Sequence, residues 1–214
     1  HRDLHSFPTR RSSDLTVKAA DAGITAISAL VEAAKGLASA ALSTSSTTDR
    51  ASYATQFDSL LTQIDDLAND SSYRGTNLLA ADTLTVNFNE DASAKLEVEG
   101  IDATTASTGL NIAGADGSWA TSTNIAAATT DLTAASNTLR AASKSLANNL
   151  NIITTRQNFT DAMIGTLQTG SDNLTLADMN AEGANMLMLQ TRQNLGTTAL
   201  SLSSQAAQSV LRLF

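Results

Sequence analysis

Apolar residues recur at alternating spacings of three and four along the first periodic stretch of the chain. They occupy Val17, Ala20, Ile24, Ile27, Val31, Ala34, Ala38 and Ala41. This spacing is typical of a coiled-coil seam. A polar break at residues 43–49 follows, and the same spacing resumes at Tyr53, Phe57, Leu60, Ile64 and Leu67. Because the break is short, we expect two antiparallel rod helices within residues 16–68.

The pattern changes to an alternation of apolar and polar residues on either side of the linker 89–93. The apolar positions there are Leu84, Val86, Phe88, Leu96 and Val98. This alternation predicts a small antiparallel β-hairpin, whose apolar face must rest on the helices because two strands alone are marginally stable. Residues 100–123 show little periodicity, and we expect a surface loop with Trp119 as its one large anchor. The hairpin and loop region together span residues 69–123.

A heptad repeat then provides the strongest signal in the chain. Its leading positions are Ile125, Leu132, Leu139, Leu146 and Ile153, and the first three of them are each followed three residues later by Ala. We expect a long rod helix over residues 124–173, with a break at 170–172. The predicted fold class is therefore mainly α, an elongated antiparallel coiled-coil-like rod with a small β-hairpin element.

The last predicted helix spans residues 174–214 and has a three-four seam of its own. The seam consists of Leu195, Ala199, Leu202, Ala206 and Leu213, and the rest of this segment is mostly Ser, Thr and Gln with little charge. A free helix of this composition would be marginally stable in water. We therefore assign the seam to packing between subunits, and assign the rod positions Ile24, Ile27 and Val31, with the five heptad positions, to packing within the rod.

Composition narrows the function classes. The chain has 214 residues and a formal net charge of −8, and it contains no Cys. Both His and the single Pro fall within residues 1–15, whose segment HSFPTRRSSDL looks like a translated sequencing-library adapter, so we interpret 1–15 as a non-native scar. The remainder is acidic and has no run of eighteen apolar residues. It lacks the basic stripe that nucleic-acid binding needs and a segment suited to spanning a membrane.

The sequence offers no set of residues for catalysis, and we expect neither an enzyme nor a cofactor. The pair Asp65 and Asp66 is interpreted as a solvated helix face, because neighbours on a helix do not face each other. The segment 178–183 imitates the start of a calcium loop, but Leu189 stands where the twelfth-position Glu would be, so no metal is expected. An enzyme would need a cluster of ionisable groups in a pocket.

Three segments resemble bacterial flagellins of the alphaproteobacterial type. They are residues 69–90 (NDSSYRGTNLLAADTLTVNFNE), 156–180 (RQNFTDAMIGTLQTGSDNLTLADMN) and 177–214, which ends in LSLSSQAAQSVLRLF. The resemblance implies a secreted structural subunit of the extracellular flagellar filament, which serves swimming motility. It also implies self-assembly through an inner core of terminal helices, an export chaperone, and cap and junction proteins as partners.

The resemblance carries two further expectations. Family members begin well before the point that aligns with Val17, so we expect an N-terminally truncated fragment. Family members that a Toll-like receptor detects carry a motif close to Arg-x-Arg-Glu-Leu on the first rod helix. The matching segment 33–37 is Ala-Ala-Lys-Gly-Leu, which lacks the first Arg and the Glu, so we expect weak or absent receptor recognition.

Two other classes stay open at this point. A hook-filament junction protein shares the same terminal helices but would carry a larger inserted domain. A generic coiled-coil adaptor would explain the heptads but not the hairpin or the match at the chain end.

Overall fold

The computed structural model describes residues 6–89, 91–175 and 179–213. Contacts within the chain divide it into two compact units, the first unit His1–Thr160 and the second unit Asp161–Phe214. The element order is three helices with a hairpin and a short 3-10 helix between the second and third, followed by a fourth helix.

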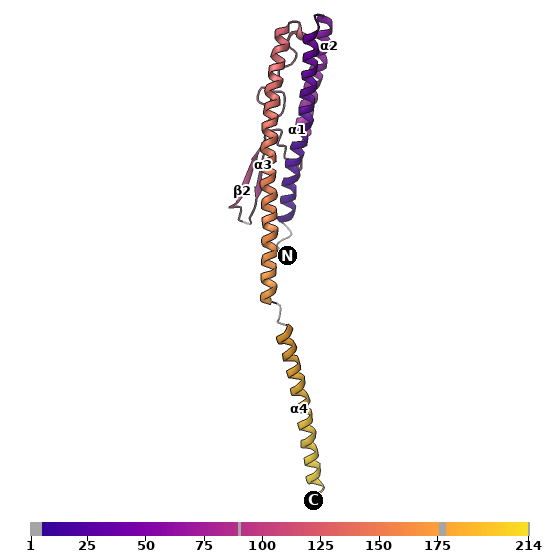
Figure 1. Ribbon diagram of the computed structural model, residues 1–214, viewed down its shortest axis with the longest axis vertical. Coiled ribbons are helices and arrows are strands. Elements are labelled where there is room, and N and C mark those ends of the chain that lie inside the picture. The colour runs from indigo at the N-terminus through magenta and orange to yellow at the C-terminus, as the bar shows by residue number, and fades with distance from the viewer. Residues whose placement is uncertain (1–5, 90, 176–178, 214) are drawn as a thin grey trace. The chain divides into compact units, whose positions relative to one another are not determined.

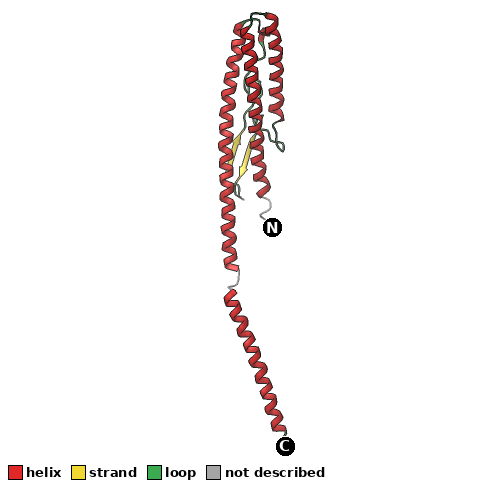
Figure 2. Cartoon of the chain, turned by 45° about the vertical axis from the view of Figure 1, so that its right-hand side comes forward, coloured by secondary structure: helices red, strands yellow, loops and turns green. Residues whose placement is uncertain are grey.

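Helices α1 and α2 form an antiparallel pair. Helix α1 spans Ser6–Ser43 and α2 spans Thr47–Asp70, so only three residues separate them. Ser46 caps α2, because its side chain accepts a hydrogen bond from the backbone N–H of Asp49. The two helices lie side by side in both views (Figure 1 and Figure 2), as the spacing of apolar residues predicts.

Helix α3, Ser122–Thr175, runs antiparallel to α1 within the first unit. The hydroxyl of Ser136 donates a hydrogen bond to Glu32 at 3.4 Å, and the hydroxyl of Ser143 donates one to Asp21 at 3.0 Å. Since the later residue of α3 meets the earlier residue of α1, the two helices have opposite directions. Figure 2 shows α1, α2 and this part of α3 bundled together.

The hairpin consists of β1, Thr83–Asn87, and β2, Lys95–Glu99. The strands are antiparallel, and the register pairs Thr83 with Glu99 and Asn87 with Lys95. Val86 and Val98 are buried and the polar residues beside them are exposed. The predicted hairpin and its buried face are therefore confirmed.

The core runs along the facing sides of the three helices and under the hairpin. All eight positions that the sequence assigned to rod packing are buried there. They are Ile24, Ile27, Val31, Ile125, Leu132, Leu139, Leu146 and Ile153. Alanines occupy many of the remaining buried positions, which allows the helix backbones to approach closely.

Residues 100–121 differ from the expected surface loop. The loop buries Ala103, Leu110 and Ile112 in addition to Trp119, which closes the 3-10 helix η1, Asp116–Trp119. The loop is fixed by hydrogen bonds to α2 and by several backbone hydrogen bonds of its own. Neither kind of contact produces a periodic pattern in the sequence.

Two helix ends also differ from the sequence analysis. Helix α3 continues through residues 170–172, where a break was expected, and ends at Thr175. A single Gly within a long helix costs about 1 kcal/mol, which is too little to end it. Helix α1 begins at Ser6, ten residues before the start that periodicity indicates.

One described helical segment, Ser12–Ser43, is long and apolar enough by length and composition to cross a membrane. Its apolar seam, from Val17 to Ala41, is buried in the core. This burial is typical of the central helix of a bundle, and the absence of a membrane span stays a prediction.

Candidate assembly surface

Large exposed apolar side chains gather in the second unit. Fourteen of the eighteen found among the described residues lie between residues 161 and 213. They are Met163, Leu167, Leu174, Met179, Met186, Leu187, Met188, Leu189, Leu195, Leu200, Leu202, Val210, Leu211 and Leu213. A concentration of this kind marks a surface that another molecule covers.

Helix α4, Met179–Leu211, has no buried residue. Hydroxyl groups such as those of Thr191 and Thr198 donate hydrogen bonds to carbonyls of their own helix. A helix within a protein gains most of its stability from tertiary packing, and an isolated helix is marginally stable in water. Among the described residues of the second unit, α4 therefore has no packing partner that would supply this stability.

Two opposite faces of α4 are apolar. One carries the predicted seam, which Met188 extends one heptad toward the start of the helix, and all five predicted positions are exposed. At 100° per residue, a second face lies on the other side of the helix. It consists of Met179, Met186, Leu189, Leu200 and Leu211. A helix with two apolar faces needs a partner on each side.

The second face was not predicted from the sequence, although it too consists of apolar residues at heptad spacing. Met179 and Met186 are seven residues apart, and Leu200 lies two heptads beyond Met186. The polar Gln193 occupies the heptad position between Met186 and Leu200, so the apolar repeat is interrupted there.

The apolar side chains at the heptad positions of α3 are buried in the first part of the helix and exposed in its last part. Ile153 is fully buried, whereas Leu167 is 64% exposed and Leu174 is 89% exposed at the same heptad position. The apolar pattern therefore continues beyond the part of α3 that α1 and the hairpin cover. This bare stretch has the same chemistry as the faces of α4.

Charge is nearly absent from α4. Its only ionisable side chains are Glu182 and Arg192, and Arg212 follows directly after its last residue. Docking on this helix therefore depends on apolar burial and shape rather than on ion pairs.

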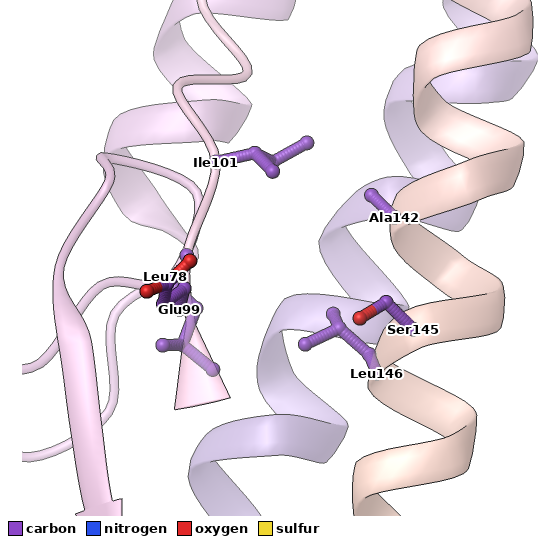
Figure 3. A pocket seen from close by; sticks show the side chains of 7 residues that line it. Leu78, Glu99, Ile101, Ala142, Ser145 and Leu146 are labelled. Carbon is purple, nitrogen blue, oxygen red and sulfur yellow. The ribbon is translucent and has the colours of Figure 1, made fainter. Parts of the chain in front are cut away.

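In the first unit, four of the described large apolar side chains are exposed, Leu15, Leu42, Ile152 and Phe159. The small cavity between the base of the hairpin and α3, lined by Leu78, Gly100, Ile101, Ala142, Ser145 and others, has a volume of about 40 Å³ (Figure 3). That volume suits a water molecule and is far below that of a substrate pocket. Within the described ranges, no group of three His, Cys, Asp or Glu side chains is placed to hold a metal ion.

Asp65 has a structural contact that its sequence context did not indicate. Its carboxylate accepts hydrogen bonds from the backbone N–H of Thr105 at 2.7 Å and from the Thr105 hydroxyl at 3.0 Å. The expectation of a solvated face therefore holds for its exposed neighbour Asp66 and is wrong for Asp65. Asp58, two turns earlier, accepts a hydrogen bond from the N–H of Ala115 at 2.8 Å.

Asp102 ties the same loop together internally. Burial acts to raise the pKa of its carboxyl, but hydrogen bonds from the Thr104 hydroxyl and N–H and from the Thr108 hydroxyl outweigh it and lower the pKa. These aspartates therefore position the loop through hydrogen bonds to its backbone and hydroxyl groups.

Comparison with known proteins relates this chain to flagellins. No family model matches it. It is 37% identical to flagellin FljM of Caulobacter vibrioides over 70 residues, which are 33% of this chain and 26% of that protein. It is also 37% identical to a flagellin of Brucella melitensis over 62 residues, covering 29% of this chain and 22% of that one. The matches thus span about a quarter of the length of these curated relatives.

The fold agrees with this relationship. The crystal structure of Bacillus cereus flagellin superposes with a TM-score of 0.60 at 17% sequence identity, covering 70% of this chain and 86% of that one. The chain thus has alphaproteobacterial flagellins as homologues over part of its length, and a flagellin-like fold.

Proposed function

We propose that this chain is a non-enzymatic structural subunit of the extracellular flagellar filament. The observation that carries the proposal is α4, a 33-residue helix with no buried side chain and two apolar faces. Such a helix is stabilised when other helices bury its apolar faces. The homology to flagellins supplies the class of assembly in which this happens.

The arrangement of surfaces favours a head-to-tail polymer over a closed pair. The two faces of α4 differ, because one is lined largely by alanine and leucine and the other by methionine and leucine. A surface that binds a different surface on the next copy generates an open helical filament unless rotation closes a ring. Neighbouring copies would bury the faces of α4 and the bare heptads of α3.

The test is a pair of charge variants on α4 in the full chain. Leu195→Asp with Leu202→Asp places two carboxylates on the predicted seam, and Asn185→Asp with Ser203→Asp places two carboxylates between the apolar faces. Burying an unpaired charge is costly, so the seam variant should lose sedimentable polymer in ammonium sulfate while the control retains it. Equal assembly of the two variants would contradict the proposal.

Three partner assignments accompany this function. We propose that an export chaperone covers the apolar faces of α4 in the free subunit, and that cap and junction proteins contact the same helix at filament ends. We also propose weak or absent Toll-like receptor activation. Ala33 stands where the flagellins that the receptor detects have an arginine, and the Lys35 Nζ is paired with the Glu32 carboxylate at 2.9 Å. A full response in a receptor reporter assay would contradict this last assignment.

A further inference from the structure

Every methionine of the chain lies on the exposed apolar surface of the second unit. The sequence contains four, Met163, Met179, Met186 and Met188, and their exposed fractions are 43%, 84%, 72% and 51%. The core of the first unit contains none. This segregation separates the side chains that peroxide can oxidise from those that maintain the fold.

The four methionines occupy the positions where assembly contacts are expected. Met188 begins the face that continues through Leu195 and Leu202 at heptad spacing. Met179 and Met186 begin the opposite face of α4, and Met163 precedes the bare heptad position Leu167 by four residues. Both faces of α4 and the bare stretch of α3 thus contain an oxidisable thioether.

We infer that these methionines form a redox-sensitive modification site that controls assembly, and this inference rests on the proposed function. Hydrogen peroxide oxidises the thioether sulfur by two electrons. The O–O bond breaks, one oxygen forms the S=O bond of methionine sulfoxide, and the other leaves as water. The product is a polar, chiral side chain in place of a flexible apolar one.

Oxidation would act on assembly and leave the folded bundle intact. A sulfoxide in an apolar helix interface loses its hydration without gaining a hydrogen-bond partner. The free subunit exposes all four sulfur-bearing side chains, whereas a neighbouring copy would cover them in the polymer. Peroxide therefore reacts faster with unassembled subunits than with the polymer. A sulfoxide reductase with a dithiol reductant would reverse the oxidation.

The experiment compares the full chain with two quadruple variants at residues 163, 179, 186 and 188. Changing each Met→Leu keeps an apolar surface that peroxide cannot oxidise, and changing each Met→Gln places a polar group there without oxidant. Assembly is measured by sedimentation in ammonium sulfate, before and after treatment with hydrogen peroxide. Mass spectrometry reports which methionines carry oxygen, and Trp119 fluorescence during urea unfolding reports the first unit.

Peroxide should raise the critical concentration of the unmodified chain by about tenfold or more, which corresponds to one unfavourable burial of a polar group. The Leu variant should assemble equally with and without peroxide, the Gln variant should behave like the oxidised chain, and the unfolding midpoint of the first unit should not change. Equal assembly of the oxidised and untreated chain would overturn this inference alone. Loss of assembly in the treated Leu variant would also overturn it. If neither the untreated chain nor the Leu variant sediments at any concentration, the proposed function fails as well.

Discussion

Phe57 and Trp119 pack against each other with ring centroids 4.7 Å apart and ring planes at 48°. Both side chains are fully buried, Phe57 on α2 and Trp119 at the end of the loop that leads into α3. The contact joins residues 62 positions apart in the sequence and fixes the beginning of α3 against α2.

We expect Phe57→Ala to lower the free energy of unfolding by about 3–5 kcal/mol, since it removes a buried aromatic ring and leaves a cavity. Because Trp119 is the single tryptophan, its emission reports this contact directly and should shift to longer wavelength. Urea unfolding followed by fluorescence measures both effects. Phe57→Leu is the control, and an equal loss in the two variants would show that the aromatic contact contributes little.

Asp65→Ala should destabilise the first unit by about 1–3 kcal/mol, because the backbone N–H of Thr105 loses its acceptor in a partly buried place. Asp66→Ala is a matched control on the next residue, whose side chain is exposed, and its effect should stay within about 0.5 kcal/mol. Thermal unfolding of both variants by circular dichroism compares them. Equal effects would mean that Asp65 does not hold the loop.

Stability should fall in acid. Hydrogen bonds place the folded pKa of Asp102 below its ordinary value of 3.8, and the Lys95 hydrogen bond similarly lowers the pKa of Glu97. A group whose pKa is lower in the folded state stabilises it above the unfolded pKa, and this contribution is lost as pH falls through the folded value.

Urea unfolding at about pH 7 and about pH 3 measures this dependence. In Asp102→Asn, which cannot titrate, the difference between the two unfolding free energies should be smaller than in the unmodified chain. An unchanged difference would remove Asp102 from the explanation.

Amides of α4 in dilute, unassembled protein should exchange with solvent near the rate of an unstructured peptide, because no residue of this helix is buried. Amides of α1 between Ala20 and Ala41 should exchange far more slowly. Hydrogen exchange with mass spectrometry measures both segments in one sample. Strong protection of α4 in the monomer would show that it is stable without a partner and would weaken the proposed assembly role.

Periodic features were predictable from the sequence. Heptad spacing located the buried faces of α1 and α3, and alternation located the hairpin with Val86 and Val98 inward. These features repeat along the chain, so each residue supports the assignment of the next. The exposed faces of α4 follow the same rule, and the second was hidden only by the polar Gln193.

Long-range polar contacts were not predictable in this way. The bonds from Thr105 to Asp65 and from Ala115 to Asp58 join positions 40 and 57 residues apart. A carboxylate that accepts such a bond has the same local sequence as one that faces water. The sequence of the loop therefore shows no pattern, although these hydrogen bonds fix the loop to α2.

A single guanidinium joins three separate parts of the chain at one end of the bundle. Arg50 donates hydrogen bonds to the carbonyls of Ala41 and Thr44, and to the Ala120 carbonyl and the Ser122 hydroxyl at the start of α3. These contacts place the beginnings of α2 and α3 next to each other, so the two helices run parallel. The helices therefore cannot fray one at a time at this end of the bundle, because losing the Arg50 hydrogen bonds releases the contacts among all three helices together.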